Sequence, residues 1–170
     1  MKKYDDQITR DRINTIHPFY REAVHCIYDE ICETVNTATS RLRFTWTTRT
    51  YEQQNNLYAQ GRTRPGGRVT NAKGGYSYHN FSMAVDIAII LDKDGNGSFE
   101  EASWNTKADF DKDGKSDWDE AVAIFKKYGW EWGGDWKRFK DLPHFQRTFG
   151  YSTADLRKMD KDEQGYVIFP

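Results

Sequence analysis

The sequence predicts an α+β domain in which helices pack against one face of a small, mainly antiparallel sheet. Some segments repeat apolar residues at helical spacing, others alternate or run apolar as strands do, and long polar loops join them. A chain of 170 residues, 37% of them hydrophobic, suits a single domain. We therefore treat residues 1–170 as one domain.

Individual patterns place the elements. Val24, Ile27 and Ile31 recur at helical spacing, and Pro18 suits a first helical turn. Residues 84–91 form an apolar run typical of a buried strand. In chain order we expect a helix within residues 8–37, a strand at 42–48, a helix at 51–60, a strand at 84–91, a helix at 118–128, a strand at 144–147, and a helix from Ser152 or Thr153 to about Met159.

Composition excludes several classes of protein. A net charge of -1 gives no general attraction to nucleic acid or anionic membranes. No apolar stretch approaches the roughly 20 residues of a membrane span. The first residues lack the apolar region of a signal peptide, so we expect synthesis in a cytoplasm. Because Cys26 and Cys32 are the two cysteines, a cysteine-rich zinc site is excluded, and any metal must use histidines and carboxylates.

Asp86 interrupts the apolar run at residues 84–91. Burying an unpaired carboxylate is expensive, so a positive charge must lie beside it, either a metal ion or an arginine. His79 precedes Asp86 by seven residues and His144 follows it by 58. Two imidazoles and a carboxylate are a common catalytic zinc set, although a lone histidine is more often structural.

The amino-acid sequences around these residues resemble motifs of a known family. Residues 77–86 read SYHNFSMAVD and resemble the S-x-H-x-x-G-x-A-x-D motif of the LAS metallopeptidases. That family includes D-alanyl-D-alanine carboxypeptidases, VanY-like enzymes and L-alanyl-D-glutamate endopeptidases. Residues 132–136 (WGGDW) and 141–145 (DLPHF) resemble the endopeptidase branch, as do Arg49, Gln54 and their neighbours. The resemblance covers about residues 42–150.

The resemblance implies the fold of the hedgehog signalling domain and DD-peptidases, and a role for each matching residue. His79, Asp86 and His144 are expected to hold one catalytic zinc ion, and Asp141 to act as the catalytic base. Arg49 is expected to bind substrate or to stabilise charge near the scissile carbonyl. The residues expected to bind substrate or to support the ligands are Gln54, Ser77 and Glu131; Glu131 and Asp135 are rival bases.

The resemblance also implies an activity, the hydrolysis of the L-alanyl-D-glutamate bond in peptidoglycan stem peptides. A D-alanyl-D-alanine carboxypeptidase is the alternative enzyme, and a wall module that binds zinc or calcium without catalysis is the alternative from another class. We expect a monomer that acts on the cell wall after release, either as a phage or prophage endolysin or as a bacterial remodelling enzyme.

One position departs from the motif, because Ser82 stands where the pattern has glycine. Glycine at such a position often serves a positive φ angle or a close backbone approach, either of which costs a serine free energy. We therefore expect some backbone strain at Ser82, with the ligands themselves intact.

Two acidic segments suggest a second kind of metal. Residues 109–120 (DFDKDGKSDWDE) fit the EF-hand calcium loop, although no entry helix precedes them. Residues 92–103 begin in the same way but have Ser103 where the pattern has glutamate. Solvated turns that introduce a helix are the alternative interpretation. The candidate calcium ligands are Asp109, Asp111, Asp113, Asp117 and Glu120.

Overall fold

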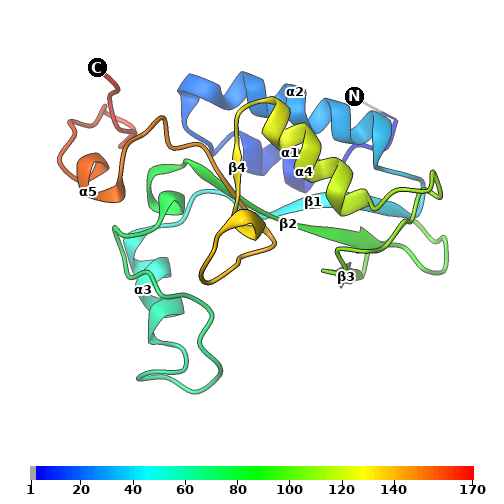
Figure 1. Ribbon diagram of the computed structural model, residues 1–170, viewed down its shortest axis with the longest axis horizontal. Helices are drawn as coiled ribbons and strands as arrows, with labels where there is room; N and C mark the ends of the chain where they lie inside the picture. The colour runs from blue at the N-terminus through cyan, green and yellow to red at the C-terminus, as the bar shows by residue number, and fades with distance from the viewer. Residues whose placement is uncertain (1–2) are drawn as a thin grey trace.

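The computed structural model describes residues 3–170 and has a sheet with three helices, α1, α2 and α4, on one side (Figure 1). This arrangement confirms the α+β prediction. The elements are α1 (Gln7–Ile13), α2 (Pro18–Thr34), β1 (Ser40–Trp46), α3 (Tyr51–Ala59), the 3₁₀-helix η1 (Tyr78–Phe81), β2 (Ala84–Leu91), β3 (Glu101–Ser103), α4 (Asp117–Lys127), β4 (Glu131–Trp132), the 3₁₀-helix η2 (Gly133–Asp135), β5 (His144–Gln146) and α5 (Thr153–Leu156).

The region predicted to contain the first helix holds two, α1 and α2. Pro18 is the first residue of α2, and the side chain of His17 caps it by accepting a hydrogen bond from the backbone N–H of Phe19. Proline lacks the N–H that would continue a preceding helix, so the break falls before it. The helix at residues 51–60 and the capped final helix occur nearly where predicted.

Strand β2 is the centre of the sheet. β1 pairs with it along one side, and on the other side β5 pairs with its first half and β3 with its second half. β4 pairs with β5 and completes an antiparallel sheet. Strands as short as β3 and β4 show too little alternation to be predicted, and neither was expected.

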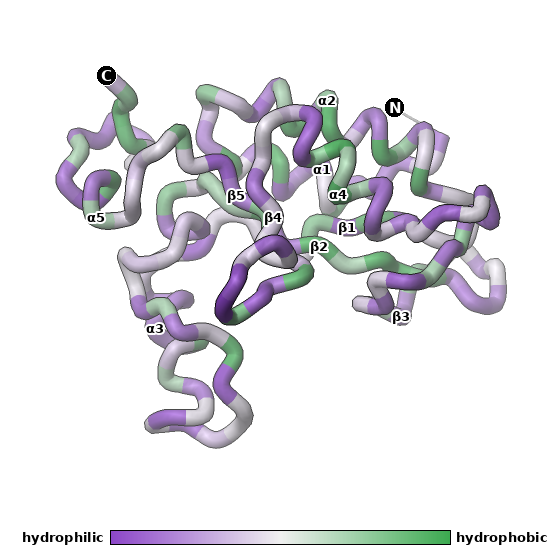
Figure 2. The backbone as a smooth tube through the Cα atoms, in the orientation of Figure 1, coloured by the Kyte–Doolittle hydropathy of each residue, from purple (hydrophilic) through white to green (hydrophobic). Residues whose placement is uncertain are grey.

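Alternation along β2 separates the core from the functional face. Val85, Ile87 and Ile89 belong to the buried apolar cluster beneath the helices, together with Phe125 of α4 and Phe145 of β5. Successive side chains of a strand point to opposite faces, so Asp86 lies on the face away from this core. Figure 2 shows the apolar residues of β2 as a green stretch of the tube through the middle of the molecule.

The structure also bears on membrane association. No helix within residues 3–170 combines the length and apolar character needed to cross a lipid bilayer.

Candidate metal centre

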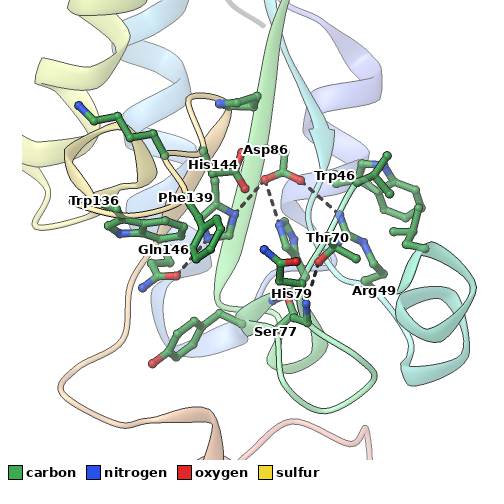
Figure 3. A pocket seen from close by; sticks show the side chains of 18 of the residues that line it. Trp46, Arg49, Thr70, Ser77, His79, Asp86, Trp136, Phe139, His144 and Gln146 are labelled. Atoms are coloured by element: carbon green, nitrogen blue, oxygen red, sulfur yellow. Dashed lines mark hydrogen bonds and ion pairs between the residues drawn. The ribbon is translucent and has the colours of Figure 1, made fainter. Parts of the chain in front are cut away.

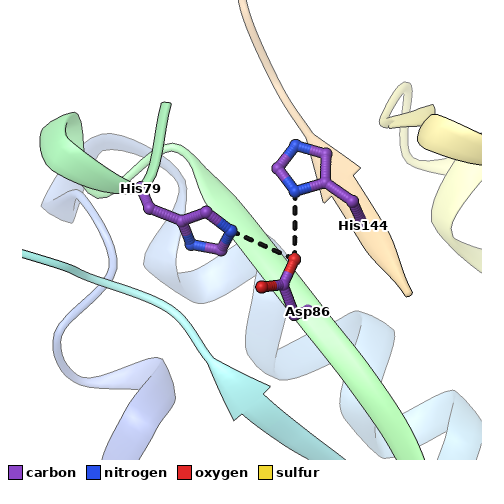
Figure 4. Close-up of side chains that lie close together, drawn as sticks. All are labelled: His79, Asp86 and His144. Carbon is purple, nitrogen blue, oxygen red and sulfur yellow. Dashed lines mark hydrogen bonds and ion pairs between the residues drawn. The ribbon is translucent and has the colours of Figure 1, made fainter. Parts of the chain in front are cut away.

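Three side chains converge beside the central strand (Figure 4). His79 comes from η1, Asp86 from β2 and His144 from the first position of β5. Asp86 Oδ1 lies 3.1 Å from His79 Nε2 and 3.0 Å from His144 Nδ1. The three ligand atoms lie within 4.8 Å of one another. The structure thus brings together the residues predicted to hold zinc, and their role as ligands stays a prediction.

Strand register explains how residues 58 positions apart meet. Asp86 and His144 are directly opposite each other in the β2–β5 ladder, so their side chains emerge on the same face. His79 is positioned by the two ends of η1. Ser77 caps its start by accepting from the backbone N–H of His79, and Ser82 ends it in a left-handed conformation with φ 61°. The chain then enters β2.

Outward hydrogen bonds fix which nitrogen of each imidazole carries a proton. His79 Nδ1 lies 2.6 Å from the carbonyl oxygen of Thr47, which can only accept. His144 Nε2 lies 3.0 Å from Gln146 Oε1. The amide of Gln146 is itself oriented, because its Nε2 donates to Glu131 Oε2 at 3.1 Å. Both rings therefore hold a proton on the outer nitrogen.

This arrangement leaves an excess of electron pairs at the centre. With the outer nitrogens protonated, neutral imidazoles turn two lone pairs towards a carboxylate oxygen that also has only lone pairs to offer. A cation must lie among them, either a metal ion or protons that convert the rings to imidazolium. Two histidine nitrogens and one carboxylate oxygen are a donor set that zinc accepts while keeping a position open for water. The residues present fit a catalytic zinc ion.

The charges at the centre shift its pKa values. Burial alone would raise the pKa of Asp86, but the hydrogen bonds and charges of His79 and His144 outweigh it and hold that pKa well below its ordinary value. Burial likewise opposes the charged form of His144, yet Asp86 and Gln146 raise its pKa. The centre is built to keep Asp86 ionised, as a metal ligand must be.

An open pocket of about 1120 Å³ lies over the three side chains (Figure 3). Trp136 and Phe139 stand on the side of His144, and Trp46 and Arg49 on the opposite side. The long loop between α3 and η1 supplies part of the wall through residues 68–72 and 76. A pocket of this size and shape admits a segment of peptide.

Comparisons with known proteins find similar peptidases. Residues 70–147 match a peptidase family model described as D-alanyl-D-alanine carboxypeptidase. Over 98 residues, 58% of this chain, the protein is 50% identical to the peptidoglycan L-alanyl-D-glutamate endopeptidase CwlK of Bacillus subtilis (strain 168). The family resemblance predicted from the sequence is confirmed. The match spans 55% of CwlK, about half the length of that curated relative.

A solved structure shares the fold. The L-Ala D-Glu endopeptidase ChiX of Serratia marcescens superposes with a TM-score of 0.50 over 84% of this chain and 87% of that chain. The two sequences are 19% identical, so this likeness supports the arrangement of helices and sheet alone.

Arg49 reaches the centre from the segment after β1. Its Nη2 lies 3.2 Å from Asp86 Oδ2, so the carboxylate uses one oxygen towards the arginine and the other towards the imidazoles. Arg49 is 7% exposed, which excludes an ordinary surface ion pair. Gln54 is fully buried and accepts from Arg49 Nη1 at 2.9 Å. Gln54 was predicted to bind substrate or to support the ligands; its burial disagrees with direct contact with substrate, and it supports Arg49, which in turn contacts Asp86.

Asp141 lies in the pocket wall between η2 and β5. Its side chain is open to solvent on one side, yet the desolvation of its carboxylate raises its pKa, with a further contribution from Asp86 that His144 opposes. Gly133 fixes the backbone here by accepting from the N–H of Asp141, and a β-carbon on Gly133 would collide with the Asp141 carbonyl oxygen. The position predicted for a base thus has a dedicated support.

The other predicted residues lie around the centre rather than in it. Ser77 lines the pocket and caps η1. Glu131 is exposed, and its carboxylate accepts hydrogen bonds from Gln146 and Thr148. Asp135 forms an exposed ion pair with Lys126. Neither Glu131 nor Asp135 lines the pocket, so both are poorly placed as rival bases.

Gln146 and Thr47 both support the centre, and the sequence interpretation missed both. Gln146 follows His144 by two residues in a strand, and this spacing places both side chains on one face. That spacing could have identified it. Thr47 was missed for a different reason, because its backbone carbonyl acts and any residue type can supply one.

Replacement of Gln146 by leucine is expected to weaken zinc binding about 10- to 100-fold, because leucine cannot accept from His144 Nε2. Competition with a chromophoric chelator measures the affinity. Thr148→Val is the matched control, since Thr148 also donates to Glu131 but does not contact His144. Equal zinc affinity in Gln146→Leu and wild type would show that this hydrogen bond does not orient the ring.

Ser82 provides a test of backbone strain. Its φ of 61° confirms the expectation that this position needs a positive φ. Ser82→Gly and Ser82→Ala both lose the hydrogen bond from Thr48, but only glycine relieves the strain. We expect the glycine variant to be more stable than the alanine variant by about 1 kcal/mol in denaturant unfolding. An alanine variant of equal or greater stability would contradict the strain.

Proposed function

We propose that this protein is a zinc-dependent peptidoglycan endopeptidase that hydrolyses the L-alanyl-D-glutamate bond of stem peptides in the cell wall. One observation carries the proposal: His79 Nε2, Asp86 Oδ1 and His144 Nδ1 converge at the floor of an open pocket whose wall holds Asp141. The similarity to a relative named for this bond directs the choice of substrate.

Asp141 is the proposed catalytic base. A bound zinc ion would lower the pKa of a coordinated water and polarise the scissile carbonyl. Asp141 is placed to take a proton from the attacking water while the water oxygen bonds to the carbonyl carbon, and it would return that proton to the leaving amine nitrogen when the C–N bond breaks. Desolvation raises the pKa of Asp141, which makes its carboxylate a stronger base towards the water. The protonated form can still give its proton to the leaving amine, which is much more basic.

Arg49 is proposed to stabilise the negative charge that develops on the oxygen of the scissile carbonyl. Arg49 contacts Asp86 Oδ2, so Oδ1, which faces the imidazoles, is the oxygen that would be available to hold the metal. Its guanidinium lines the pocket and stays charged, which favours the negative charge that develops on the carbonyl oxygen. Gln54 holds Arg49 in place from behind.

The rim of the pocket suits an acidic peptide. Exposed cationic side chains of Arg68, Arg138 and Lys140 line it. A stem peptide that contains D-glutamate carries free carboxylates, which such side chains attract. Aromatic walls from Trp46, Trp136 and other rings offer apolar contact to the rest of the peptide.

A D-alanyl-D-alanine carboxypeptidase is the second candidate, because the matching family model carries that description. The identity of 50% to a relative named as an endopeptidase favours the first candidate. Digestion of purified muropeptides followed by mass spectrometry separates the two. We expect cleavage between L-alanine and D-glutamate, its loss on treatment with a chelator and its return with zinc. Release of terminal D-alanine alone would contradict the endopeptidase proposal.

Replacement of Asp141 by alanine is expected to lower the rate of wall hydrolysis about 10²- to 10⁴-fold while zinc stays bound, because the variant lacks the proton acceptor. Hydrolysis of purified walls and metal analysis of the same samples measure the two quantities. Asp135→Ala is the matched control, since this nearby carboxylate does not line the pocket and its removal should leave the rate unchanged. Undiminished hydrolysis by Asp141→Ala would remove Asp141 from the mechanism and favour a different base.

A further inference from the structure

A second group of carboxylates lies in the loop between β3 and α4 and in the first turn of α4. Figure 1 shows where these two elements lie in the fold. Oxygens of Asp109, Asp111 and Asp117 lie within 4.8 Å of one another, and so do those of Asp111, Asp113 and Glu120. Asp111 belongs to both sets, so the two sets adjoin each other. None of these five residues lines the pocket over the zinc centre.

The backbone of this loop turns tightly around the carboxylates. Gly114 has φ +93° and Lys112 has φ 64°. The carboxylate of Asp109 accepts from the backbone N–H of Lys112 at 2.6 Å and of Gly114 at 3.0 Å. These bonds bring the first and sixth positions of the EF-hand pattern together, as the pattern requires. They shape the loop but do not neutralise its charge.

Two buried oxygens in the cluster have no partner. Asp117 is 1% exposed, and while its Oδ1 accepts from the N–H of Phe110 at 3.0 Å, its Oδ2 accepts no hydrogen bond from residues 3–170. Glu120 Oε2 is likewise buried without a donor. An unsatisfied buried carboxylate oxygen is costly, so native structures usually supply a donor or an ion.

Electrostatics point the same way. Burial raises the pKa of Asp117 to about 6, and the negative charges of Asp111 and Asp109 add to the effect. Lys115 offers a partial counter-charge, with its Nζ 2.8 Å from Asp113 Oδ2 and 3.7 Å from Glu120 Oε1. Its side chain is 66% exposed, so it gives the buried Asp117 no compensation and is free to move into solvent.

We propose that this loop binds a calcium ion through Asp109, Asp111, Asp113, Asp117 and Glu120. The donors are all oxygens and include no imidazole or thiolate, which favours a hard cation over zinc. Calcium accepts six to eight oxygens in flexible geometry, whereas magnesium demands a near-octahedral set and retains its waters. In the EF-hand pattern the seventh position adds a backbone carbonyl, here that of Lys115.

The ion would stabilise the first turn of α4, a helix that packs against β5, the strand that carries His144. Asp117 and Glu120 lie in the first turn of α4. Phe125 of the same helix stacks on Phe145 of β5, with ring centroids 4.1 Å apart, and Phe145 follows His144. Calcium binding thus stabilises the packing behind the zinc centre without contributing to it chemically.

The segment 92–103 is a natural comparison within the chain. It resembles the same pattern, yet both oxygens of Asp92 are satisfied, Oδ1 by the N–H of Asn96 and Oδ2 by that of Gly97. Ser103 stands where the bidentate glutamate belongs. No buried carboxylate oxygen in this segment lacks a partner, so we assign it no ion.

Calorimetric titration of calcium into the full chain, with thermal unfolding of the same samples, tests the proposal. We expect one ion per chain, a dissociation constant between about 10⁻⁶ and 10⁻³ M, and a midpoint of unfolding that rises with calcium. Asp117→Asn should bind at least about 100-fold more weakly. In calcium-free buffer this variant should unfold at or above the wild-type temperature, because it removes an unpaired buried charge while Oδ1 can still accept from Phe110.

Controls separate this site from the zinc centre. Asp119→Asn changes the same charge two residues away on an exposed side chain and should leave calcium affinity unchanged, as should Asp94→Asn in the other segment. The zinc content of every sample should stay constant. An absence of calcium binding by wild type at millimolar concentration, or equal affinity in Asp117→Asn, would overturn the proposal. If Asp117→Asn fails to fold, Glu120→Gln gives the same comparison.

Discussion

The pairing of Asp86 with His144 across two adjacent strands is the constraint on which the candidate centre depends. The antiparallel register places one carboxylate oxygen opposite one imidazole, and η1 delivers a second imidazole to the same oxygen. Because a strand alternates faces, a slip of one residue in this ladder would turn Asp86 into the apolar core. The buried residues on both sides of Asp86 oppose that slip. The packing of the core therefore keeps Asp86 opposite His144 on the other face of the sheet.

The support around the centre reaches across several elements. Thr47 after β1, Gln146 on β5 and Glu131 on β4 fix the protons of the two imidazoles, and Arg49 fixes the second oxygen of the carboxylate. These hydrogen bonds hold each predicted ligand in one orientation, so less conformational entropy would be lost when a metal binds. The groups that would preorganise the centre therefore lie outside the predicted ligand set.

Part of this arrangement could be predicted from sequence and part could not. A carboxylate inside an apolar run identifies Asp86, because burial of charge is costly whatever the fold. The spacing from His144 could have indicated Gln146, but the hydrogen bond from Gln146 to Glu131 could not be predicted, since β4 has two residues and shows no periodicity. The family resemblance suggested that Gln54 could bind substrate, yet it is fully buried against Arg49. Spacing predicted the acidic loop, whereas the unpaired oxygen of Asp117 required coordinates.

The distance along the chain between Asp86 and His144 has a further consequence. An ion bound by both residues closes a loop of 58 residues. If His79 binds the same ion, the loop from His79 to His144 is longer still. A cross-link of this span removes conformational freedom from the unfolded chain in the way a long-range disulfide does. The same bound ion would then extend the lifetime of the protein among proteases, in a chain whose two cysteines form no disulfide.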